Sequence, residues 1–174
     1  MNKTIKLSLL SAVVVTAFGI NEASAQATGN TTLTVQLDQV RSITVADATV
    51  NITFNSAADY INGKSTTKNN HLVVTSTADY EVKVKSGGDL INGSNSIPIG
   101  TISLTPTAGS TGTAPDNLLP ITNLSNTDQT IASSATGTVQ TSINVQYAAS
   151  GGTNYVNVPS GNYTATITYS IEAL

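Results

Sequence analysis

Residues 162–172, close to the C-terminus, alternate strictly between apolar and polar side chains. Tyr163, Ala165, Ile167, Tyr169 and Ile171 share one parity, and Thr164, Thr166, Thr168 and Ser170 share the other. Successive side chains of an extended chain point to opposite faces, so this pattern is typical of a β-strand with one buried face. The segment therefore predicts a half-buried strand, which is the clearest element of the sequence.

Shorter runs of the same kind occur along the rest of the chain. We expect strands at residues 32–37, 42–45, 49–54, 71–75, 80–85, 97–104, 129–132, 138–147 and 155–158, with a short apolar segment bent by Pro120 at residues 118–124. Residues 55–70 are polar and turn-rich, and no stretch carries the 3.6-residue period of an amphipathic helix. The sequence therefore predicts an all-β fold, an antiparallel Ig-like β-sandwich of about 7–10 strands.

Two of these runs lie close together and predict a β-hairpin. Residues 71–75 contain three consecutive apolar residues, residues 76–79 can turn the chain, and residues 80–85 alternate, with Glu81, Lys83 and Lys85 on the outer face. We expect the C-terminal strand to be the partner of this hairpin in the core.

The N-terminus has the pattern of a cleaved signal peptide. Lys3 and Lys6 precede an apolar run over residues 7–20, and Ala23-Ser24-Ala25 is a small-x-small cleavage site. The alternative, a membrane anchor, needs about 20 apolar residues. We therefore expect a signal peptide at residues 1–25, a single domain at residues 26–174 without a membrane span, and a secreted, periplasmic or cell-surface location.

The composition excludes several kinds of chemistry. The chain has no Cys, so it cannot form disulfides, thiol-based zinc sites or a thiol nucleophile. Only 10% of its residues are charged and the net charge is -3, so the basic footprint of a nucleic-acid-binding protein is missing. We expect no cofactor and no nucleic-acid partner.

Candidate catalytic residues are few. His71 is the single histidine, no Gly-x-Ser-x-Gly motif surrounds a serine, and we expect His71 to be exposed to solvent. The aspartates stand singly, mostly at turns, although a calcium site built from separate loops stays open. Glu81 and Glu172 show no pairing of the kind a glycosidase needs. The sequence therefore predicts a protein that is not an enzyme.

Tyr60 and Tyr155 are the candidate ligand contacts, because they lie in or beside loops rich in Asn and Gly. An exposed tyrosine next to asparagine could stack on a sugar ring and hydrogen-bond its hydroxyls. Alternatively, the two rings pack over the end of the sandwich, as amphipathic tyrosines often do.

Two segments resemble the paired motifs of bacterial WxL cell-surface domains. These are residues 78–86, with Tyr80 two positions before Val82, and residues 163–171, with Tyr169 two positions before Ile171. Tyrosine stands at both positions where that family has Trp. The resemblance implies secretion, a β-sandwich-like domain and non-covalent attachment at the cell wall.

The ending of the chain also resembles fimbrial and spore-coat-U-like subunits, whose last strand alternates close to the C-terminus. In chaperone-assembled pili an alternating N-terminal segment completes the sandwich of a neighbouring subunit by strand addition. Leu33, Val35 and Leu37 could serve in this way, or they could form the first strand of their own domain.

These observations together predict an exported, non-enzymatic bacterial cell-surface protein with a structural or adhesive role, WxL-like or pilin-like. The alternative is a glycan- or peptidoglycan-binding module of the cell envelope. The expected partners are a cell-envelope polymer, other surface proteins or further copies of the same chain.

Overall fold

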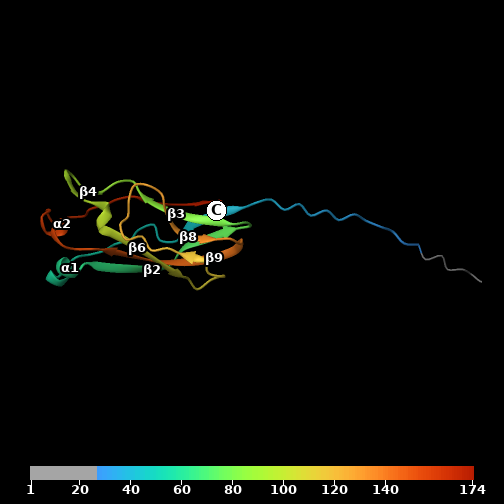
Figure 1. Ribbon diagram of the computed structural model, residues 1–174, viewed down its shortest axis with the longest axis horizontal. Helices are drawn as coiled ribbons and strands as arrows, with labels where there is room; N and C mark the ends of the chain where they lie inside the picture. Colours follow the sequence, from blue (N-terminus) through green and yellow to red (C-terminus); the bar gives the residue numbers. More distant parts are fainter. Residues whose placement is uncertain (1–26) are drawn as a thin grey trace, which may run out of the picture. The chain divides into compact units, whose positions relative to one another are not determined.

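The computed structural model describes residues 27–174, so the expected signal peptide lies outside the described residues. The chain divides into two units, and the described part of the first unit, residues 27–36, contains no helix or strand. The second unit, Leu37–Leu174, is an antiparallel β-sandwich, which confirms the predicted fold class (Figure 1).

Two four-stranded sheets form the layers of the sandwich. The first, sheet A, has the order β1 (Arg41–Val45), β2 (Lys64–Ser76), β9 (Thr138–Ala149), β6 (Ile102–Ala108). The second, sheet B, has the order β10 (Ile167–Glu172), β3 (Tyr80–Ser86), β8 (Gln129–Ser134), β7 (Asn117–Leu118). A ribbon of β4 (Leu90–Asn92) and β5 (Asn95–Ile97) and three short helices, α1 (Ala57–Asn62), η1 (Ile99–Thr101) and α2 (Thr153–Val156), complete the described elements. Figure 1 shows α1, α2 and β4 together at one end of the sandwich, which we call the helix end.

The core lies between the two sheets, where the inward parity of the central strands is fully buried. Its fully buried aliphatic side chains include Leu72 and Val74 of β2, Val82 and Val84 of β3, Leu104 of β6, and Ile143 and Val145 of β9. Burying one such side chain stabilises the fold by about 1.5–3 kcal/mol relative to leaving it exposed. The alternation seen in residues 80–85 and 141–147 therefore reports the core faces correctly, whereas Val139, on the same parity, is 89% exposed.

The hairpin predicted from residues 71–75 and 80–85 is wrong. β2 pairs with β1 and β9, whereas β3 pairs with β10 and β8, so the two strands belong to opposite sheets. Residues 77–79 carry the chain from sheet A to sheet B. The apolar faces of β2 and β3 therefore pack against each other across the core, whereas the strands of a hairpin would lie side by side in one sheet.

The polar connection predicted over residues 55–70 is also wrong in part. β2 already begins at Lys64, and its first half pairs with β9 from Lys64 to Lys68. This half carries Thr, Lys and Asn where an ordinary strand has apolar side chains, so periodicity gave no signal. Before it, Ser56 caps α1 in a capping box with Asp59, a start signal that needs no apolar stripe.

The C-terminal strand is shorter than predicted, and three other predicted strands are absent. β10 covers Ile167–Glu172, while residues 32–37 and 49–54 carry no strand, and residues 155–158 overlap the short helix α2. The predicted partnership with residues 80–85 is confirmed: Tyr169 lies opposite Val84 and Ile171 lies opposite Val82 in the β10–β3 ladder.

Candidate functional site

At one side of the sandwich, an edge strand of sheet A lies beside an edge strand of sheet B. Among the described residues, neither strand pairs with a further strand on its outer edge. Among the described residues, β1 pairs only with β2 and β10 pairs only with β3, and β1 and β10 lie close to each other. Residues 49–54 extend the β1 side without pairing as a strand, and residues 163–166 precede β10. We call this boundary the seam. Its two sides are β1 with residues 46–54, and residues 163–172.

Apolar side chains line the seam at strand spacing but are only partly covered. They are Val50, Ile52 and Phe54 on one side, and Ala165, Ile167, Tyr169 and Ile171 on the other, and all pack partly buried against the core. On the neighbouring β3, by contrast, the inward side chains Tyr80, Val82 and Val84 are fully buried. The inner face of β10 can therefore make further apolar contacts, whereas the inner face of β3 is already fully covered.

The predicted strand-exchange residues Leu33, Val35 and Leu37 are largely exposed. Leu33 is 86% exposed, Val35 is 71% exposed and Leu37 is 88% exposed. They keep the period of a strand, yet residues 27–40 contain no assigned secondary structure. Several apolar side chains that repeat at strand spacing and remain exposed are unusual in a monomeric folded protein, because burying them would lower the free energy.

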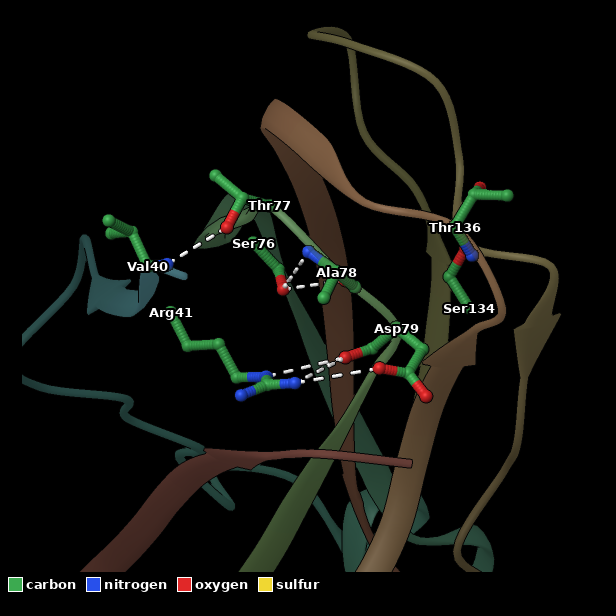
Figure 2. A network of polar contacts seen from close by, with 8 residues as sticks. All are labelled: Val40, Arg41, Ser76, Thr77, Ala78, Asp79, Ser134 and Thr136. Atoms are coloured by element: carbon green, nitrogen blue, oxygen red, sulfur yellow. Dashed lines mark hydrogen bonds and ion pairs between the residues drawn. The ribbon is translucent and has the colours of Figure 1, made fainter. Parts of the chain in front are cut away.

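A polar network fixes the chain where the sandwich begins. The backbone N–H of Val40 donates to the Thr77 hydroxyl at 2.9 Å, and the Thr77 N–H donates back to the Val40 carbonyl at 2.9 Å. The Arg41 guanidinium donates to the Asp79 carbonyl at 3.2 and 3.3 Å and reaches the Asp79 carboxylate at 3.5 Å (Figure 2). Residue 40 is therefore held beside the turn between β2 and β3, and residues 27–39 precede this anchor.

His71 is buried, so its predicted exposure to solvent is wrong. The ring is only 1% exposed. The β2–β9 register is interrupted between Lys68 and Leu72, and Asn70 has a positive φ of 51°. This β-bulge rotates the strand, so that the consecutive residues His71 and Leu72 both face inward. The predicted exposure depended on the position of His71 directly after the polar residues 68–70, and a polar sequence of this kind does not show the bulge that turns the ring inward.

The bulge is held by the side chain of Asn70. Its amide oxygen accepts hydrogen bonds from the Ser110 N–H at 2.8 Å, the Ser110 hydroxyl at 3.1 Å and the Ser142 hydroxyl at 2.9 Å. The Asn70 N–H donates to the Asn144 side chain at 2.7 Å. Asparagine tolerates the left-handed conformation better than most residues, so these contacts and the backbone agree.

His71 belongs to a hydrogen-bonded chain that crosses the core. Its Nδ1 lies 3.2 Å from the Asp47 carboxylate, its Nε2 lies 2.8 Å from the Tyr147 hydroxyl, and that hydroxyl lies 2.5 Å from the Tyr169 hydroxyl. We call these four residues the relay. An ionised carboxylate can only accept, so Nδ1 carries a proton; with a neutral ring, Tyr147 then donates to Nε2 and Tyr169 donates to Tyr147.

The electrostatics of the relay do not favour catalysis. Burial raises the pKa of Tyr147 to about 12 and also raises the pKa of Tyr169, so neither phenol is an activated nucleophile. Hydrogen bonds from His71 and from Lys68, whose ammonium lies 3.3 Å away, lower the pKa of the Asp47 carboxyl. The Asp–His pair thus leads to buried phenols and not to a serine.

Tyr60 and Tyr155, the candidate glycan contacts, lie together at the helix end around Phe54. The Phe54 and Tyr155 rings stack with centroids 4.9 Å apart, and the Tyr60 ring meets Phe54 edge-on at 5.2 Å. The Tyr155 hydroxyl also lies 2.8 Å from the Thr101 hydroxyl, and burial raises the pKa of Tyr155. One face of the Tyr155 ring is therefore already in use.

The four residues of the WxL-like motif occupy unequal environments. Tyr80 and Val82 are fully buried in β3, whereas Tyr169 and Ile171 are partly exposed in β10. The Tyr80 hydroxyl is buried without a hydrogen-bond partner among the described residues. On the outer face of these strands, Lys83 bridges Glu81 at 2.9 Å and Glu172 at 2.7 Å, and these contacts raise the pKa of Lys83.

Residues 27–174 contain no group of three or more His, Cys, Asp or Glu side chains that could hold a metal ion. None of the helices in this part of the chain is long and apolar enough to span a membrane. No family model matches the chain. No curated protein matches it either.

Proposed function

We propose that this chain is an exported, non-enzymatic structural subunit of a bacterial cell surface, and that copies of it associate by strand addition. The exposure of Leu33, Val35 and Leu37 on one face of a segment without secondary structure carries this proposal. In strand addition an extended segment pairs with an open sheet edge, and its alternate side chains enter pockets of the acceptor. This segment has the apolar period that such an addition needs.

The seam of a second copy is the acceptor that fits this segment. β10 carries a ladder on one edge only, among the described residues, and its inward side chains are partly exposed. Ile167, Tyr169 and Ile171 repeat every second residue, as Leu33, Val35 and Leu37 do. Both sets therefore have a spacing of about 6.8 Å, so three side chains of the added strand can interlock with three side chains of β10.

The anchor at residue 40 supports the role of residues 27–39 as a donor. The contacts of Val40 and Arg41 fix where the segment joins the sandwich. Leu33 lies seven residues before Val40 in the sequence, and an extended chain of that length spans roughly 24 Å. The six residues of β10 span about 20 Å, so the segment is long enough to line the whole strand.

The test is the state of association of the protein spanning residues 26–174. We expect Val35→Asp to abolish multimers in size-exclusion chromatography with light scattering, because the charge would enter the acceptor core. Thr34→Asp is the matched control, since Thr34 lies on the opposite parity and should leave multimers intact. Equal behaviour of the two variants, or a wild-type protein that stays monomeric up to high concentration, would refute strand addition.

A glycan- or peptidoglycan-binding module is the second candidate function. The gathering of Tyr60 and Tyr155 around one phenylalanine at the helix end favours it. Sedimentation of the protein with purified cell wall tests this candidate separately. We expect Tyr60→Ala to reduce the bound fraction if the cluster contacts sugar, whereas Val35→Asp should not affect it.

A further inference from the structure

We infer that the relay Asp47–His71–Tyr147–Tyr169 is a latch that holds the seam closed and that strand addition has to release. This inference rests on the proposed function, because it concerns the regulation of the same seam.

The relay connects the two sides of the seam through the core. Asp47 follows β1 on one side, and Tyr169 is the middle residue of the inward-facing row of β10 on the other. Between them, His71 of β2 and Tyr147 of β9 pass the hydrogen bonds across sheet A. Lys68 adds an ion pair of 3.3 Å to Asp47, so this end of the relay is also tied to β2.

The chain departs from regular strand geometry in order to build this relay. An unbroken β2 would not direct His71 and Leu72 to the same side, and the bulge at Asn70 makes that possible. A buried imidazole, the buried phenol of Tyr147 and the partly buried phenol of Tyr169 also cost free energy relative to apolar side chains, unless each finds a partner. Features of this kind, kept against local preference, are typical of positions with a role beyond packing.

The relay opposes the insertion of a strand at the seam. β1 and β10 lie close together, so a strand pairing with the free edge of β10 has to move β10 and the segment after β1 apart. The Tyr169 ring stands between Ile167 and Ile171, where the added side chains would enter. Moving β10 therefore stretches the bond between the Tyr169 and Tyr147 hydroxyls first.

Uptake of a donor peptide tests the latch. The protein spanning residues 26–174, at a concentration too low for multimers, is mixed with a labelled peptide of residues 29–40. Anisotropy gives the uptake rate, and hydrogen exchange follows the β10 amides. We expect Tyr169→Phe to take up the peptide about three- to tenfold faster, as loss of one hydrogen bond implies. Tyr163→Phe is the matched control, because its hydroxyl donates to the Pro159 carbonyl outside the relay, and we expect it to match the wild type.

A second variant tests the other end of the relay. Asp47→Ala removes the acceptor of His71 at a partly exposed position, and it should also accelerate uptake and β10 exchange. If both variants have a lowered melting temperature but take up the peptide no faster than the wild type, the relay is structural only. That result would leave the proposed function standing. If neither the wild type nor the variants take up the peptide, while the peptide carrying Val35→Asp behaves identically, strand addition and the latch both fail.

Discussion

The hydroxyl of Tyr147 on β9 lies 2.5 Å from the hydroxyl of Tyr169 on β10, so a hydrogen bond joins the two opposite sheets through the core. The partners of a buried polar pair have to be satisfied, because an unpaired hydroxyl in an apolar environment costs free energy. His71 and Asp47 provide the remaining partners, and the series of hydrogen bonds ends at the Asp47 carboxylate near the surface. The sandwich therefore has a polar connection at the side where its edges are open.

The first prediction concerns stability at alkaline pH. The pKa of Tyr147 is raised to about 12 in the folded protein, above the ordinary value of 10.0 that applies to the unfolded chain. Between these values the unfolded chain loses a proton that the folded protein keeps, so stability falls as the pH rises. This tyrosine contributes about 1.4 kcal/mol of lost stability per pH unit in that window. Urea unfolding of Tyr147→Phe between pH 10 and pH 12 should show a shallower fall than the wild type, and parallel curves would contradict the assignment.

The second prediction concerns the acid side of the relay. The pKa of Asp47 is lowered from 3.8 by the hydrogen bonds from His71 and Lys68. A group with a lowered folded pKa contributes stability above its unfolded pKa, and this contribution is lost as the pH falls through the folded value. Asp47→Asn should therefore lower the urea midpoint at neutral pH and flatten its decline below about pH 4. A decline as steep as that of the wild type would show that Asp47 does not drive it.

The third prediction concerns the buried hydroxyl of Tyr80. It has no hydrogen-bond partner among the described residues, and burial raises the pKa of this tyrosine. Removing an unsatisfied buried hydroxyl relieves its desolvation penalty, so Tyr80→Phe should increase the free energy of unfolding by about 1 kcal/mol. Tyr155→Phe is the contrasting variant, since it removes a hydroxyl bonded to Thr101 at 2.8 Å and should cost about 1 kcal/mol. Denaturant unfolding at neutral pH measures both, and a destabilised Tyr80→Phe would indicate a bound water or another hidden partner.

The sequence predicted the fold class because the core faces follow a simple period. Residues 80–85, 138–147 and the end of residues 162–172 became β3, β9 and β10, and the partnership of the C-terminal strand with residues 80–85 was predicted. The sheet assignment of neighbouring strands could not be predicted, since alternation shows that a strand has one buried face but not which strand lies beside it. That is why the hairpin of residues 71–75 and 80–85 was wrong.

The candidate site was only partly visible in the sequence for related reasons. Leu33, Val35 and Leu37 could be named from the sequence, because their alternating pattern lies within one short segment. The relay could not, because its hydrogen-bonded neighbours are 22 to 76 residues apart in the sequence and are brought together by two sheets and a bulge. One signal was present: an Asn–Asn pair stands directly before the single histidine, and asparagine is the residue that most readily accepts a left-handed conformation after glycine.

The last prediction concerns that bulge. Asn70→Ala places an ordinary side chain at a φ of 51° and removes the acceptor of three hydrogen bonds, so it should cost about 2–3 kcal/mol of unfolding free energy. Asn70→Gly relieves the backbone strain and loses only the hydrogen bonds, so it should cost clearly less. Asn69→Ala is the matched control, since Asn69 is exposed and should change stability by less than about 0.5 kcal/mol.

The same variants report on the position of His71. His71 is the single histidine of the chain, so the rate of its modification by diethylpyrocarbonate measures the exposure of this one ring. The 1% exposed ring should react slowly in the wild type and in Asn69→Ala, and faster in Asn70→Ala, because loss of the bulge turns the ring away from the core. If Asn70→Ala is destabilised while His71 stays protected, the bulge supports the fold of β2 but does not place the histidine in the relay.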